Sequence, residues 1–236
     1  MTPDLLAPDL LAEVMEATWP PARRWQLGPF TLRDGAGGGK RVSAASCDGP
    51  FADTDLDAAE AAMAEPLVLI REVDTALDAA LDARGWRIID PVVAYAAPVA
   101  ALTAELPALT AFPHWPPLEI ARALWAEGGI GPARIAVMDR VTGPKAALLG
   151  RTGDRPAGVG FVACHGAEAM LHALEVRDSQ RRQGLGRSLI HAAANWAAEQ
   201  GAARLSLVVT RQNAAARALY ARLGMQAVGQ YHYRMK

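Results

Sequence analysis

The sequence of 236 residues has little of what marks secreted, membrane and disordered proteins. Its two cysteines, Cys47 and Cys164, are too few for a disulfide framework or a cysteine-rich zinc site, so we expect no bound metal. No uncharged apolar run reaches about 18 residues, which excludes a membrane-spanning helix, and the first residues lack a signal-peptide pattern. A net charge of −1 with 51% hydrophobic residues excludes a disordered chain. We therefore expect a cytoplasmic globular protein without a membrane partner.

Acidic residues are scarce in the last quarter of the chain. Residues 177–236 carry 10 basic and 2 acidic side chains, a balance of +8, whereas residues 1–100 carry 8 and 16, a balance of −8. A basic segment in a nearly neutral protein predicts an anionic ligand, and arginine suits phosphate because it offers two parallel N–H donors. Few aromatic residues lie among these arginines, so a small phosphorylated ligand fits as well as nucleic acid does. A solvated basic face is the third interpretation.

Apolar spacing predicts a mixed α/β (α+β) fold, a sheet with helices packed on it. In the first half we expect a helix with apolar positions from Leu6 to Met15 that ends at Trp19, helices at 57–64 and 74–84, and strands at 30–33, 41–46, 67–70 and 87–96, with residues 35–39 as a hairpin loop. In the second half we expect helices at 118–127, 187–200 and 213–223, and strands at 133–138, 146–151, 157–164, 169–176, 205–209 and 225–234. Residues 101–117 are interpreted as the connection between the halves.

The loop at 177–188 joins an apolar strand to the start of the long helix and carries two glycines, Gly184 and Gly186. Amides in the first helical turn have no internal acceptor, and the helix dipole favours negative charge there. Glycine leaves the backbone open to a diphosphate, Ser188 adds a hydroxyl, and nearby arginines add positive charge. The loop matches neither a Walker P-loop nor a dinucleotide fingerprint. Glycine spacing alone leaves an ordinary helix cap or tight turn equally open.

Two motifs in the last quarter resemble signatures of the GCN5-related N-acetyltransferase (GNAT) family. Residues 181–186, Arg-Arg-Gln-Gly-Leu-Gly, resemble the family pattern Arg/Gln-x-x-Gly-x-Gly/Ala. Residues 213–225 resemble a second pattern, Asn-x-x-Ala-x-x-Leu-Tyr-x-x-Leu-Gly-Phe, with Met225 in place of the final Phe. The two motifs occur in the family's order, and the close resemblance covers about residues 145–236.

The resemblance implies a GNAT-type twisted mixed sheet flanked by helices, and acetyl-CoA-dependent acetylation of a primary amine by direct attack. In the family the glycine loop binds the CoA diphosphate, and main-chain groups on two splayed parallel strands, here 171–176 and 205–209, bind the pantetheine arm. The cofactor-binding residues that it implies are Leu174, Val176, Arg181, Arg182, Gln183, Gly184, Leu185, Gly186, Arg187, Ser188 and Asn213. It implies no metal.

The resemblance implies a catalytic acid but does not identify the general base. Tyr220 matches the family tyrosine that protonates the departing thiolate, although a buried aromatic core residue is the alternative. Asn213 matches a CoA contact and is also a good helix N-cap. The family does not fix the general base: Glu175 ranks first, a relayed water and His172 are the alternatives, and strand alternation places Glu175 and His172 on opposite faces unless a bulge intervenes.

The first half resembles a degenerate copy of the same domain, because residues 77–86 look like the family helix that ends in Leu-Gly-Phe. It lacks the glycine loop, so we expect no CoA there. We therefore predict a tandem arrangement of two related halves: 1–100 degenerate, 101–117 connecting, and 118–236 catalytic. Tyr231 and Tyr233 are candidates for an aromatic wall at the acceptor site.

The predicted partner is a small-molecule or peptide amine rather than nucleic acid, and a homodimer is left open. The first alternative function is a non-catalytic acyl-CoA-binding regulatory protein. The second is a nucleic-acid binder, favoured only by the basic last quarter.

Overall fold

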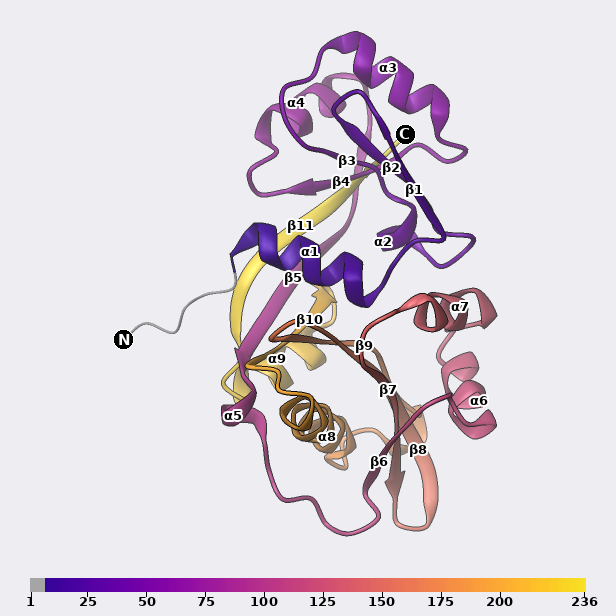
Figure 1. The fold of residues 1–236 in the computed structure, drawn as a ribbon, viewed down its shortest axis with the longest axis vertical. Helices are drawn as coiled ribbons and strands as arrows, with labels where there is room; N and C mark the ends of the chain where they lie inside the picture. The colour runs from indigo at the N-terminus through magenta and orange to yellow at the C-terminus, as the bar shows by residue number, and fades with distance from the viewer. Residues whose placement is uncertain (1–6) are drawn as a thin grey trace.

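The computed structural model describes residues 7–236 and contains two sheets (Figure 1). The small sheet has the order β1 (Arg23–Leu27), β2 (Phe30–Asp34), β3 (Ser46–Cys47). The large sheet has eight strands in the order β4-β11-β5-β10-β9-β8-β7-β6. These strands are β4 (Leu67–Arg71), β5 (Arg87–Pro98), β6 (Ala111–His114), β7 (Lys145–Thr152), β8 (Arg155–His165), β9 (Glu168–Val176), β10 (Arg204–Thr210) and β11 (Gln226–Met235). A mixed sheet with helices on it is thus confirmed.

Helices cover both faces of the large sheet. They are α1 (Pro8–Thr18), α2 (Lys40–Ser43), α3 (Asp53–Ala62), α4 (Thr75–Ala83), α5 (Val99–Leu102), α6 (Glu119–Glu127), α7 (Pro132–Arg140), α8 (Leu185–Glu199) and α9 (Ala214–Arg222). In Figure 1, α8 lies on one side of strands β6 to β8, and α6 and α7 lie on the other, while α1 crosses the middle of the molecule. Within residues 7–236, no helix is long and apolar enough to cross a membrane.

The two halves repeat one order of elements and exchange a strand. In the first half the chain runs from β3 through α3 to β4, and a parallel bridge pairs Ala45, just before β3, with Val68 of β4. In the second half it runs from β9 through α8 to β10, which pairs with β9 in parallel. Each half then adds a helix and a last strand, β5 or β11. β5 lies between β10 and β11, and β11 lies between β4 and β5, so each half contributes its last strand to the sheet of the other (Figure 1). The boundaries at 100 and 117 stay a prediction, since one sheet spans both.

Three predicted elements differ from the structure. Residues 133–138 form helix α7 rather than a strand: Pro132 starts the helix, where a missing N–H costs nothing, and Ile135 and Met138 face the core at helical spacing. Residues 41–46 form α2 and the start of β3. The strand that pairs with β2 is β1, joined to it by a turn at Gly28 with φ 55°. The predicted connection contains β6. The described part of the first helix begins at Pro8, so Leu6 lies outside the described residues.

The second half has a core on each face of its sheet. On one face Leu185 and Leu189 of α8 fill the space above two glycines, Gly150 and Gly158, where a Cβ atom would come within 2.9 Å of its neighbours. On the other face the fully buried Trp125 of α6 packs with β8 and α7 residues. This packing fixes the strand ends that form the site described next.

Candidate active site

The parallel strands β9 and β10 separate at their carboxyl ends. Their pairing runs from Glu168–Arg204 to Leu171–Leu207, and both strands continue beyond that point, to Val176 and Thr210, without pairing each other. β9 stays paired with β8, and β10 with β5. The predicted splay between two parallel strands is therefore confirmed, and it leaves main-chain groups of residues 172–176 without partners on β10.

A bulge in β9 decides where its polar side chains point. His172 pairs with Phe161 and Glu175 with Val159, so two residues of β9 oppose the single residue between Phe161 and Val159. Ala173 has φ 50°, and its carbonyl accepts a hydrogen bond from Trp125 Nε1 at 2.8 Å. Partner residues two positions apart share a face of the sheet. His172 and Glu175 therefore lie on the same face, the one covered by α6 and α7.

His172 is held as a neutral imidazole. Its Nδ1 atom accepts a hydrogen bond from the Arg41 guanidinium at 2.8 Å, so the ring proton is on Nε2, which donates to Thr18 Oγ1 at 2.9 Å. The Thr18 hydroxyl in turn donates to the Val14 carbonyl at 2.6 Å. Complete burial and the positive charge of Arg41 lower the pKa of His172 well below its usual value. With both nitrogens engaged, His172 is a poor general base.

The Glu175 carboxylate makes no hydrogen bond in the described part of the chain and has one long ion pair, with Arg181. Its side chain is about one-third exposed, at 32%, and its pKa is raised by burial, against a lowering by Arg181, whose guanidinium lies 3.9 Å away. Gly128, at the end of α6, gives it room: a Cβ atom there would lie 2.9 Å from Glu175 Cγ. A half-buried carboxylate with a raised pKa fits the predicted base.

The loop before α8 has the geometry of an anion site. Gly184 is the N-cap of α8, with φ 87°, a conformation that glycine adopts without strain. Within the described residues, the amides of Leu185, Gly186 and Arg187 make no hydrogen bond, and Ser188 is the first whose amide bonds back, to the Gly184 carbonyl at 3.1 Å. A 15-residue helix therefore directs three free amides outwards.

Side chains around this loop differ in what they offer a ligand. Arg182, Gln183 and Arg187 are exposed, whereas Arg181 folds back, donating to the Val176 carbonyl at 3.0 Å and pairing with Asp178 at 2.8 Å. The residues of this loop and of β9 were assigned to the cofactor site from the family resemblance, and their contacts with a ligand stay a prediction. Leu185 is buried in the core, Leu174 and Val176 pack against it, and the Ser188 hydroxyl lies 3.5 Å from the Gly184 carbonyl oxygen.

The second predicted motif forms α9. Asn213 caps it: its Oδ1 atom accepts from the Ala216 amide at 3.1 Å. Tyr220 is buried, with its ring centroid 5.6 Å from that of Tyr95 in β5. Burial, followed by the negative charge of Glu175, raises the pKa of Tyr220 to about 12. The phenol therefore stays protonated near neutral pH.

One chamber opens on the α6–α7 side of the splay, and a second adjoins it. The splay chamber, of about 230 Å³, is lined by His172 and Ala173 of β9, by residues 208–210 of β10, and by residues from both halves: Gly38, Gly39, Lys40, Arg41, Asp90, Arg134, Tyr231 and Tyr233 among them. Both tyrosines predicted to form an aromatic wall thus line it, with ring centroids 5.6 Å apart.

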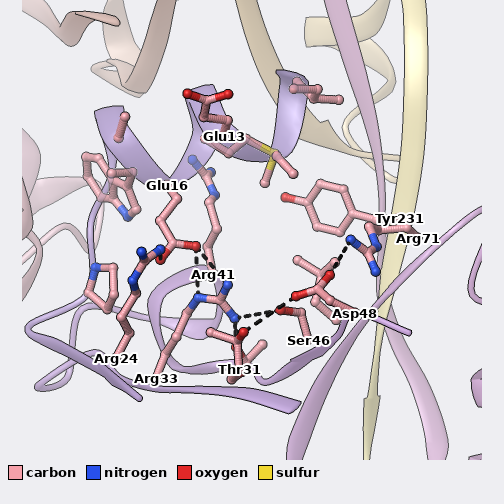
Figure 2. Close-up of a pocket in the computed structure, with 18 of the residues that line it drawn as sticks. Glu13, Glu16, Arg24, Thr31, Arg33, Arg41, Ser46, Asp48, Arg71 and Tyr231 are labelled. Atoms are coloured by element: carbon pink, nitrogen blue, oxygen red, sulfur yellow. Dashed lines mark hydrogen bonds and ion pairs between the residues drawn. The ribbon is translucent and has the colours of Figure 1, made fainter. Parts of the chain in front are cut away.

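The α1 chamber is larger, about 700 Å³, and lies between α1 and strands β1 to β4 (Figure 2). It shares Trp19, Arg41 and Tyr231 with the splay chamber. Its size is that of small-molecule sites in proteins. Its walls come from segments more than 200 residues apart in the sequence, so no local pattern could have predicted it.

A model of the acetyltransferase (GNAT) family matches residues 131–225. These residues form a GNAT domain. They contain the splayed strands, the α8 loop and α9, and therefore every candidate catalytic and cofactor-binding residue that the sequence predicted, whereas Tyr231 and Tyr233 lie beyond them. The curated relative "Uncharacterized N-acetyltransferase YobR" of Bacillus subtilis is 35% identical over 66 residues, which is 28% of this chain and 27% of that protein. The chain thus matches about a quarter of that relative's length.

Solved structures show the same fold over nearly the whole chain. A GCN5-related N-acetyltransferase from Kribbella flavida has a TM-score of 0.69 at 20% identity, covering 96% of this chain and 94% of that one. A tandem GNAT protein from the clavulanic acid biosynthesis pathway has a TM-score of 0.61 at 15% identity, covering 98% and 88%. The GNAT-type sheet and the two related halves are therefore confirmed.

The sequence missed the residues that the first half contributes. Lys40, Arg41 and Asp90 reach the splay although they lie more than 70 residues before β9. Only the glycine-rich segment 35–39 drew attention to this region, and it reads as a hairpin. In the structure it is the turn into α2, and it carries Arg41 to the site.

Proposed function

We propose that the chain is an acetyl-CoA-dependent N-acetyltransferase that moves an acetyl group to a primary amine by direct attack in a ternary complex. The arrangement of the splay carries this proposal. On one side of the sheet the free amides of α8 offer an anion site, and on the other the splay chamber offers room for an acceptor. Both reactants can therefore reach the gap between β9 and β10.

Different residues of this chain would bind the cofactor and accept the proton. Amides of residues 185–187, with Arg182 and Arg187, bind the diphosphate, and main-chain groups of Leu174 and Val176 bind the pantetheine arm. Acetyl-CoA supplies the acetyl group as a thioester. Glu175 accepts the proton that the acceptor ammonium must lose, directly or through a water.

In the transfer the amine nitrogen forms a bond to the acetyl carbon, and the carbon–sulfur bond breaks. Tyr220 donates its phenolic proton to the departing thiolate. The pKa of Tyr220 at about 12 keeps that proton in place until a thiolate needs it. Holding both reactants on one sheet supplies the orientation that such a reaction needs.

A thiol-release screen of amine acceptors with acetyl-CoA tests the proposal. Gly186→Glu is the control: position 186 lies outside the left-handed region, and a Cβ atom there would lie an ordinary 3.4 Å from Leu219, so the helix should tolerate the change. The added carboxylate would repel the diphosphate. We expect at least one acceptor to give turnover in the natural chain and none in the variant. Turnover that never exceeds that of Gly186→Glu would contradict the assignment.

A further inference from the structure

Among the residues that the structure describes, Arg41 is a cation without a counter-charge. Its guanidinium donates to His172 Nδ1 at 2.8 Å and lies 5.8 Å from the centroid of the Trp19 ring. Its Nε atom is buried and has no hydrogen-bond partner. No carboxylate of residues 7–236 lies within 4.0 Å of Arg41. Because His172 is neutral, it orients the guanidinium without neutralising it.

Neighbouring arginines show the contrast. In the α1 chamber Arg24 and Arg33 both pair with Glu16, at 3.0 and 2.7 Å, and Arg71 pairs with Asp48 at 3.0 Å. In Figure 2 dashed lines join Arg33 to Glu16 and Arg71 to Asp48, and none reaches Arg41. The chain thus pairs three arginines of the chamber with carboxylates. The exposed Arg23 lies over the Trp25 ring, whereas Arg41 is partly buried and has no carboxylate partner among residues 7–236.

The position of Arg41 links it to the reaction. It lines the splay chamber together with Ala173 of the bulge, and it also lines the α1 chamber. The other charges of the splay chamber do not cancel it: Lys40 pairs with Asp90 at 2.7 Å, and the exposed Arg134 has no ion pair in the described part of the chain. The residues that line the splay chamber therefore carry an excess of positive charge, which is unsuited to a simple polyamine.

We propose that Arg41 binds a carboxylate of the acceptor, so that the acceptor is an amino acid: an amine that also carries a carboxylate. The amine lies at the splay, and the carboxylate replaces the missing counter-ion of Arg41 through charge-assisted hydrogen bonds. The acceptor's side chain then extends past Arg41 into the α1 chamber, where Leu11, Met15 and Leu69 provide apolar surface. This inference rests on the proposed function, since it names the class of acceptor for that reaction.

Matched acceptor pairs test it. Each pair consists of an α-, β- or γ-amino acid and its carboxamide, and kcat/KM is measured by thiol release with acetyl-CoA. We expect the natural chain to prefer the acid of its best pair at least about tenfold, because hydrogen bonds between two charged groups outweigh neutral ones. Arg41→Gln should reduce that preference to within about twofold. Arg155→Gln, which removes an exposed arginine at the start of β8, should leave it unchanged.

Binding provides a second readout that needs no turnover. Calorimetric titration of the same pairs into the chain saturated with coenzyme A should give the same acid preference, again lost in Arg41→Gln. Arg41→Lys keeps the positive charge but loses the two parallel N–H donors of the guanidinium, so it should retain part of the preference for acids. This variant covers the case in which Arg41→Gln does not fold.

The outcomes separate the two proposals. Amides used or bound as well as acids, an unchanged preference in Arg41→Gln, or no binding of any amino acid would overturn the carboxylate site. Failure of the transferase proposal is seen separately, as absence of turnover with every acceptor while acid binding at Arg41 persists.

Discussion

Replacing Tyr220 with phenylalanine removes one hydroxyl group from the wall between α9 and β5. Within the described residues this hydroxyl makes no side-chain hydrogen bond, so its loss should change the free energy of unfolding by less than about 1 kcal/mol. The α8 amides that we propose as the CoA site are untouched, so CoA affinity should stay within about twofold. Loss of the proton donor should lower kcat by about 100-fold or more, the range of general acid catalysis.

The assay is the initial rate of thiol release with a saturating acceptor, alongside calorimetry with CoA. Since the pKa of Tyr220 is raised to about 12, the phenol is protonated from about pH 6 to about pH 10, and the defect should be the same throughout that range. Tyr95→Phe is a matched control, because it removes the neighbouring hydroxyl, which accepts from Arg217 at 3.4 Å, and should keep most of the activity.

A kcat within about twofold of the natural chain would refute the acid role of Tyr220. The same variant separates an enzyme from a non-catalytic acyl-CoA-binding regulator. An enzyme loses turnover and keeps CoA, whereas a regulator has no turnover to lose and keeps its effect on its partner.

Two further predictions concern β9 and its neighbours. Glu175→Gln should lower kcat about 100-fold and abolish the acidic limb of the pH profile of kcat. That limb should lie above pH 4.5 in the natural chain, because burial raises the pKa of the Glu175 carboxyl. An acidic limb that survives the substitution would mean that the acceptor amine, and not Glu175, causes it. Gly158→Ala places a Cβ atom 2.9 Å from the Glu175 carbonyl oxygen and 3.1 Å from Leu185 and Leu189. It should therefore lower the free energy of unfolding, measured in urea, by about 1–3 kcal/mol. An unchanged midpoint of the urea unfolding curve would contradict the packing of α8 on this glycine.

Local patterns predicted the elements that local interactions determine. The glycine at 184 marks both the end of a loop and the start of α8, since only a residue that adopts positive φ easily fits there. Asn213 marks the start of α9 because its side chain satisfies a free amide. Such signals need no knowledge of the rest of the chain.

The bulge in β9 could not be predicted in this way. Ala173 has φ 50°, a conformation that an alanine in the sequence does not predict. It is held by a hydrogen bond from Trp125, which belongs to a helix almost 50 residues earlier. The faces of His172 and Glu175 follow from that contact. The proposed role of Arg41 is also non-local, because it depends on the packing of the first half against β9 and β10 of the second.

Titration of coenzyme A into the purified chain tests the central claim, that the free amides of α8 bind a diphosphate. Three chains are compared: the natural one, Gly186→Ala and Gly186→Glu. We expect uptake by the first two with affinities within about threefold, and binding at least about 100-fold weaker in Gly186→Glu. No uptake by the natural chain, or equal uptake by Gly186→Glu, would contradict the account.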